Sequence, residues 1–218
     1  MIGSETVGLE EIKKRGVVAV IRGATPKSII SIGNALKNGG VTAFEITMET
    51  PKAMSVIEAA ASYFGKDVLV GAGTVLDAET ARAAILSGAR FIFSPTVRKE
   101  TITMAKRYSV ISVPGAFTPT EILTAYEYGA DLIKVFPASS VGPEYFKNIA
   151  GPLPHIPLMP TGGVDVHNTG DYFRAGAVAV GVGSTLVNTK KDLSEEALHN
   201  MMEKASHFMK EVRIARGE

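Results

Sequence analysis

Short apolar runs rich in β-branched residues alternate along the chain with longer stretches in which apolar residues recur every three or four positions. The runs are too short for ordinary helices and predict strands, whereas the longer stretches predict amphipathic helices. We count eight strand-plus-helix units, an alternation typical of parallel βαβ structure. The predicted strands span residues 17–21, 43–48, 68–70, 91–93, 110–113, 132–136, 157–159 and 177–182.

Capping residues and glycines mark the helix boundaries. Several helical stretches begin with Thr or Asp and have proline near the first turn. Gly39, Gly88, Gly129 and Gly176 lie where helices should end, because glycine readily adopts the left-handed conformation that stops a helix. We expect helices over residues 26–38, 51–64, 78–86, 98–108 and 118–128, with further helices at 8–15 and 194–214.

Eight successive units whose strands are apolar on both faces favour a closed (β/α)8 TIM barrel with an extra N-terminal helix. A doubly wound open sheet is the structural alternative. The 218 residues fit one such barrel, and no linker or low-complexity stretch interrupts the pattern. We therefore expect a single domain over residues 1–218.

Composition and charge narrow the functional classes. Apolar residues make up 45% of the chain and charged residues 21%, as in an ordinary soluble globular protein. A net charge of +1 argues against nucleic acid as a partner, because tight binding to phosphates needs a basic surface. The first residues lack the pattern of a secretion signal, and no apolar run is long enough to span a membrane. We expect a cytoplasmic protein with no membrane partner.

Metal and thiol chemistry are not expected from this sequence. The chain has no cysteine, which excludes disulfides, thiolate metal sites and a cysteine nucleophile. His155, His167, His199 and His207 have no metal-ligand spacing, so we expect no metal site.

Lys134 is an unusual residue for an apolar strand. It lies in the run Leu132-Ile133-Lys134-Val135-Phe136, where alternation directs Leu132, Lys134 and Phe136 to the barrel interior. Burial favours the neutral form of an amine, and a neutral amine can attack a carbonyl to form a Schiff base. The alternative is a buried structural lysine that pairs with an acid.

Glu45 is the corresponding anomaly in the second predicted strand. Glu45 and Thr47 face opposite to Phe44 and Ile46, so both should also face the interior. An apolar environment raises the pKa of a carboxyl group toward neutrality, which suits a group that takes and returns a proton at a carbon next to a carbonyl. Lys134 and Glu45 together predict an imine-forming lysine and a proton shuttle. A mutual salt bridge that fills the barrel is the alternative.

Two further polar side chains lie where predicted strands end. Arg22 closes the first strand, and Thr74 follows a predicted turn, Gly71-Ala72-Gly73, after the third. Both would reach the C-terminal mouth of the barrel, where this fold places its sites. A guanidinium and a hydroxyl suit a substrate carboxylate, although a surface salt bridge is the alternative for Arg22.

Glycine-rich loops follow the last two predicted strands, as Pro160-Thr161-Gly162-Gly163 and Gly181-Val182-Gly183-Ser184. Glycines let backbone N–H groups approach an anion, and the start of the following helix adds the positive end of its dipole. The two loops therefore predict a phosphate site. Such a cradle would also serve a phosphosugar isomerase or epimerase, or a phosphosugar-binding or sensing protein without activity.

These motifs resemble, in their order and spacing, the bacterial 2-keto-3-deoxy-6-phosphogluconate (KDPG) and 4-hydroxy-2-oxoglutarate aldolases. The resemblance covers about residues 16–187. It rests on Phe44-Glu45-Ile46-Thr47, Gly71-Ala72-Gly73-Thr74, Ser94-Pro95, Pro114-Gly115 with Thr118-Pro119-Thr120-Glu121, Leu132-Ile133-Lys134-Val135-Phe136-Pro137, and the two glycine-rich loops.

The resemblance implies a class I aldolase in which Lys134 forms the Schiff base with pyruvate, and Glu45 acts as general acid and base. It also implies that Thr74 and Arg22 hold the substrate carboxylate. The expected assembly is a homotrimer without a cofactor, and the expected small-molecule partners are pyruvate and a phosphorylated keto-deoxy sugar acid. The residues implied for the phosphate are Gly162, Gly163, Gly183 and Ser184, and those implied for the pocket are Pro95, Phe136 and Thr161.

The chain departs from the family pattern four residues after the glutamate, where many members have arginine and this chain has Glu49. We expect Arg22 to take over carboxylate binding; the alternative is that Glu49 alters which aldehyde is accepted. Thr161 matches the gluconate-type members, so we expect cleavage of KDPG to pyruvate and glyceraldehyde 3-phosphate. Cleavage of 4-hydroxy-2-oxoglutarate to pyruvate and glyoxylate is a second expected reaction, and an aldolase for the galactonate epimer is the alternative.

Overall fold

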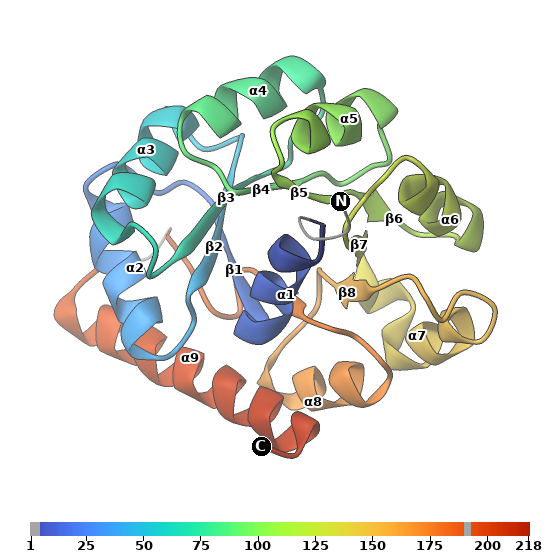
Figure 1. Cartoon of the computed structure of the whole chain (residues 1–218). Helices are drawn as coiled ribbons and strands as arrows, with labels where there is room; N and C mark the ends of the chain where they lie inside the picture. Colours follow the sequence, from blue (N-terminus) through green and yellow to red (C-terminus); the bar gives the residue numbers. More distant parts are fainter. Residues whose placement is uncertain (1–4, 190–192) are drawn as a thin grey trace.

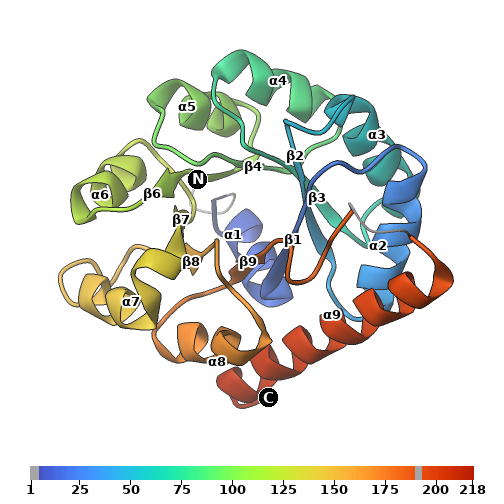
Figure 2. The ribbon, with the colours of Figure 1, turned by 180° about the vertical axis from the view of Figure 1, so that it is seen from behind.

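The structure, a computed structural model, describes residues 5–189 and 193–218. Parallel strands curl around a central axis in this part of the chain, and Figures 1 and 2 look along that axis from opposite sides. The strands are β1 (Val17–Ile21), β2 (Ala43–Thr47), β3 (Leu69–Gly73), β4 (Phe91–Phe93), β5 (Ile111–Val113), β6 (Gly115–Ala116), β7 (Ile133–Val135), β8 (Leu158–Pro160) and β9 (Val180–Val182).

The strands form two parallel sheets. One has six strands in the order β5-β4-β3-β2-β1-β9, and the other has three in the order β6-β7-β8. At one junction only Pro114 separates β5 from β6, and the Lys134 N–H donates to the Pro114 carbonyl at 3.0 Å. At the other, a single bridge joins Thr161 to Gly181. The α/β class is confirmed. The two sheets curl around one axis (Figure 1), whereas the doubly wound alternative requires a single open sheet.

Helices cover the outside of the curled sheet (Figure 1). The predicted N-terminal and C-terminal helices are present, and α7 and α8 occupy the places of the helices that the eight predicted units require but whose bounds were not predicted. The helices are α1 (Glu5–Arg15), α2 (Ser28–Asn38), α3 (Ala53–Phe64), α4 (Ala78–Leu86), α5 (Lys99–Arg107), α6 (Pro119–Glu127), α7 (Gly142–Ala150), α8 (Val166–Arg174) and α9 (Glu195–Arg216), with a 3-10 turn η1 (Ala138–Ser140).

The predicted end of the third strand and the predicted conformation at the end of the first covering helix are both wrong. The third strand extends through Gly71 and Gly73, which the sequence predicted to form a turn. Both glycines lie in the strand because bulky side chains occupy the space beside them: an added Cβ would lie 2.4 Å from the Phe91 ring at Gly71 and 1.7 Å from Glu45 at Gly73. Gly39 ends α2 with φ of −80°, and the left-handed residue is its neighbour Gly40.

The core has two parts. A large outer layer packs between the sheets and the helices. A smaller cluster fills the inside of the curl. Ile12 of α1 belongs to the inner cluster together with Val18, Phe91, Leu132 and Met159. Helix α1 therefore closes the end of the fold at which the strands begin, and only the opposite end is left for a site.

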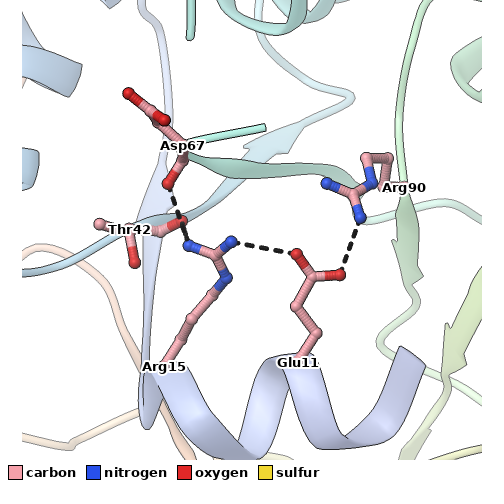
Figure 3. A network of polar contacts seen from close by, with 5 residues as sticks. All are labelled: Glu11, Arg15, Thr42, Asp67 and Arg90. Carbon is pink, nitrogen blue, oxygen red and sulfur yellow. Dashed lines mark hydrogen bonds and ion pairs between the residues drawn. The ribbon is translucent and has the colours of Figure 1, made fainter. Parts of the chain in front are cut away.

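Polar contacts fasten α1 in this position (Figure 3). Glu11 accepts from Arg15 at 3.0 Å and from Arg90 at 2.8 Å. Arg15 also donates to the carbonyl oxygens of Thr42, at 2.8 Å, and Asp67, at 3.2 Å. Thr42 and Arg90 directly precede β2 and β4, and Asp67 lies shortly before β3. These contacts therefore join one helix to the beginnings of three strands.

None of the described helices has both the length and the apolar character needed to cross a membrane.

Candidate active site

Lys134 lies inside the curl, as its position in the strand predicts. It is the central residue of β7 and is only 5% exposed. Its Nζ atom lies 5.5 Å from the centroid of the Phe93 ring and 5.1 Å from that of Phe136. A buried amine between two aromatic rings is held by weak cation–π attraction when it is protonated.

Glu45 is completely buried on β2, and neither of its carboxylate oxygens has a hydrogen-bond partner in the described chain. Burial raises the pKa of the Glu45 carboxyl above its ordinary value, an effect that the positive charges of Lys134 and Arg22 partly offset. Since Glu45 accepts no hydrogen bond from Lys134, the alternative of a direct salt bridge between them is wrong. An unpaired buried carboxyl with a raised pKa suits proton transfer near neutral pH.

Gly73 provides the space that the Glu45 side chain occupies, so we expect Gly73→Ala to disturb both folding and catalysis. The added methyl group would lie 1.7 Å from the Glu45 Oε1 atom, and overpacking of this kind costs about 2–3 kcal/mol. The measurement is urea unfolding together with aldol cleavage. Gly151→Ala is the control, because a Cβ there makes only an ordinary contact at 3.6 Å. Equal stability of the two variants would contradict the expectation.

Arg22 and Glu49 lie at the mouth of the curl, after β1 and β2. The Arg22 guanidinium is 3.6 Å from the Glu49 carboxylate, with both side chains more than half exposed. The Arg22 backbone is held from two sides: the Thr189 hydroxyl donates to its carbonyl, and the next residue, Gly23, donates its N–H to the Thr50 hydroxyl at 2.9 Å. The surface salt bridge considered for Arg22 is therefore present, and the guanidinium lies at the edge of a cavity.

That cavity has a volume of about 490 Å³ and opens where β1, β8 and β9 end. It brings together seven of the predicted site residues: Arg22, Phe136, Thr161, Gly162, Gly163, Gly183 and Ser184. Pro95 instead lines a neighbouring cavity of about 370 Å³ that shares Phe136 as a wall. Lys134, Glu45 and Thr74 are not part of either lining.

Thr74 has a strained backbone. Its φ of 55° lies in the left-handed region, which is unfavourable for a β-branched residue. It directly follows β3 and is partly buried. Such strain persists where the surrounding structure enforces it, and it is concentrated at functional sites.

The two glycine-rich loops present free backbone donors to the cavity. Gly162 and Gly163 have φ of 88° and 78°, and within the described chain the N–H groups of Gly162, Gly163 and Ser184 donate to no acceptor. The sequence predicted that a helix start after each loop would add the positive end of its dipole, and the structure does not provide this. Asp165 caps α8 with its own carboxylate, and β9 is followed by a single turn at Gly183 rather than by a helix start. The unpaired amides are therefore the feature of these loops that suits an anion.

A protein-family model for the aldolases, described as KDPG and KHG aldolase, matches residues 9–202. The chain belongs to the KDPG and KHG aldolase family. It is 34% identical to the 2-dehydro-3-deoxy-6-phosphogalactonate aldolase of Escherichia coli K12 over 93% of this chain and 97% of that protein. It is 36% identical to the 2-dehydro-3-deoxy-phosphogluconate aldolase of Pseudomonas aeruginosa, over 82% of this chain and 86% of that protein.

Solved structures agree with this assignment. A native KDPGal structure has a TM-score of 0.87 at 32% identity, covering 93% of this chain and 96% of that one. The KDPG aldolase of Legionella pneumophila, with pyruvate captured as a covalent carbinolamine, has a TM-score of 0.81 at 28% identity, covering 94% and 98%. This aldolase is thus a carbon–carbon lyase, and the isomerase and sensor interpretations are set aside.

Sequence reasoning did not place Phe93 beside Lys134. Phe93 contacts the Lys134 amine, yet it was assigned only to a strand. Alternation within Phe91-Ile92-Phe93 would have placed Phe93 inside the curl, as both inner rings are fully buried. Its nearness to Lys134 depends on closure of the sheet, which the local pattern does not contain.

No cluster of three metal-ligating side chains occurs among the residues that the structure describes.

Proposed function

We propose that this aldolase cleaves KDPG to pyruvate and glyceraldehyde 3-phosphate through a Schiff base on Lys134. The observation that carries the proposal is the buried, unpaired combination of Lys134 and Glu45 within a fold whose mouth offers free backbone N–H groups. The Legionella relative supports it, because pyruvate is bound covalently in that structure.

In the proposed reaction, the neutral Lys134 amine attacks the C2 carbonyl. The resulting carbinolamine takes up one proton from solvent and loses water to give the iminium ion. Glu45 then accepts the C4 hydroxyl proton while the C3–C4 bond breaks, and the bonding electrons move to the iminium nitrogen to form an enamine. The aldehyde leaves, Glu45 returns the proton to C3, and water releases pyruvate from Lys134. The imine is itself the electron sink, so the reaction requires no cofactor.

The remaining predicted residues take binding roles. Arg22 would exchange Glu49 for the substrate carboxylate, and Thr74 would add a hydroxyl donor to it. The loops at Gly162, Gly163, Gly183 and Ser184 would receive the phosphate on unpaired amides, with Pro95 and Phe136 as walls. We further propose a complete (β/α)8 barrel as a single domain over residues 1–218, assembled as a homotrimer and working in the cytoplasm.

The galactonate epimer is the second candidate substrate. It is favoured by the E. coli relative, a phosphogalactonate aldolase that matches 93% of this chain. The gluconate epimer is favoured by Thr161, which matches the gluconate-type members of the family. Its Oγ1 atom is buried in the cavity lining, has no hydrogen-bond partner in the described chain and can bind a sugar hydroxyl. Unphosphorylated 4-hydroxy-2-oxoglutarate would use the same lysine without the phosphate loops.

The test is to measure kcat/KM for both epimers and for 4-hydroxy-2-oxoglutarate by coupled detection of pyruvate. We expect KDPG to have the highest value, unchanged by EDTA, and Thr161→Val to reduce the preference for KDPG about tenfold through loss of one hydrogen bond. A higher value for the galactonate epimer would replace KDPG as substrate. No cleavage of any of the three would overturn the proposal.

A further inference from the structure

Lys134 and Glu45 place an amine and a carboxyl group inside one apolar interior, and yet the two groups are not bonded to each other. The positive charge of Lys134 acts on Glu45, but both oxygens of Glu45 are without a hydrogen-bond partner in the described chain. In a medium of low polarity such charges attract strongly, and a direct pair would be the expected arrangement. The amine is instead in contact with aromatic rings.

Phe93 and Phe136 supply that contact. Their ring centroids lie 5.5 and 5.1 Å from the Lys134 Nζ atom, within the range of cation–π attraction. Phe93 is fully buried, and its ring is braced by Phe91 at 4.8 Å between centroids. Phe91 in turn fills the space that Gly71 leaves open. The Phe93 ring therefore cannot turn away from the lysine without disturbing the inner core.

We propose that Phe93 is a positioning residue that, with Phe136, prevents Lys134 from closing a direct ion pair with Glu45. A ring face holds an ammonium group more weakly than a carboxylate does, so the amine remains free to meet an entering carbonyl. Glu45 in turn remains free to accept the substrate proton. The inference rests on the proposed role of Lys134 as the imine-forming residue.

The test is the rate at which borohydride traps the pyruvate imine in four proteins: the parent, Phe93→Leu, Glu45→Gln, and the double variant. Phe93→Leu is expected to slow trapping about tenfold in the parent background, as loss of a cation–π contact lets the ion pair form. With glutamine at position 45 no ion pair can form, so Phe93→Leu should then change the rate less than about twofold. Phe93→Tyr keeps the ring face and should retain the parent rate.

Phe146→Leu is the matched control, because Phe146 is also fully buried and packs on an aromatic ring, that of Tyr172, but lies on α7. Equal slowing by Phe93→Leu in both position-45 backgrounds, or by Phe146→Leu, would assign the effect to packing alone and overturn the inference. If Phe93→Leu does not fold, Phe93→Met serves in its place. Absence of trapping in the parent protein would overturn the proposed function itself, which distinguishes the two failures.

Discussion

Lys134→Arg is expected to abolish aldol cleavage, with kcat/KM lowered by at least about 10⁴-fold. Arginine keeps the positive charge inside the curl, but its guanidinium does not become neutral and cannot form an imine. The remaining residues would still bind substrate, so binding and covalent chemistry separate in this variant. Intact-protein mass after incubation with pyruvate and borohydride should show one adduct in the parent and none in Lys134→Arg.

Lys99→Arg is the control for that experiment. The Lys99 amine also lies over an aromatic ring, 5.5 Å from the centroid of Tyr128, but it projects from the exposed surface of α5. It should therefore keep parental activity and the same single adduct. Full adduct formation in Lys134→Arg would remove Lys134 from the mechanism. Peptide mapping of the adduct to another lysine in the parent would do the same.

Glu45→Gln is expected to lower kcat by about 10²–10⁴-fold while KM changes little, because an amide cannot exchange a proton with substrate. Burial raises the pKa of Glu45, and the carboxyl must be ionised to accept a proton. The parent kcat should therefore rise with pH through that raised pKa. The variant should lose this acidic limb of the profile, and an unchanged profile with parental kcat would refute the role of Glu45.

The same substitution should stabilise the fold. A carboxyl with a raised pKa holds its proton more tightly in the folded state, so the stabilisation that it provides is complete below the unfolded pKa, about 4.3, and is lost as pH rises through the folded pKa. Above that pH the folded protein carries a buried carboxylate to which no group in the described part of the chain donates a hydrogen bond. We expect Glu45→Gln to melt above the parent at about pH 8, with the difference declining toward about pH 4. A difference independent of pH would contradict this.

Sequence periodicity predicted most elements because strands and helices are local structures. The boundaries of β1, β4 and α4 agree with prediction, and the capping box of Thr118 and Glu121 begins α6 where its spacing indicates. The predicted third strand was too short because glycine is unfavourable in strands. In the structure, Glu45 and Phe91 need the space beside Gly73 and Gly71, and this outweighs the preference. The requirement comes from residues on neighbouring strands, so the local sequence does not contain it.

The sequence by itself determined the α/β class, the inward direction of Lys134 and Glu45, and the two glycine-rich loops, since each follows from alternation or from residues adjacent in the chain. The tertiary structure decided which of these groups meet: that Phe93 rather than Glu45 contacts the lysine amine, that Arg22 faces Glu49, and that α1 closes the opposite end. These contacts join segments distant in sequence. They depend on how far the sheet curls, and that curl is set by packing of the whole core and not by any local pattern.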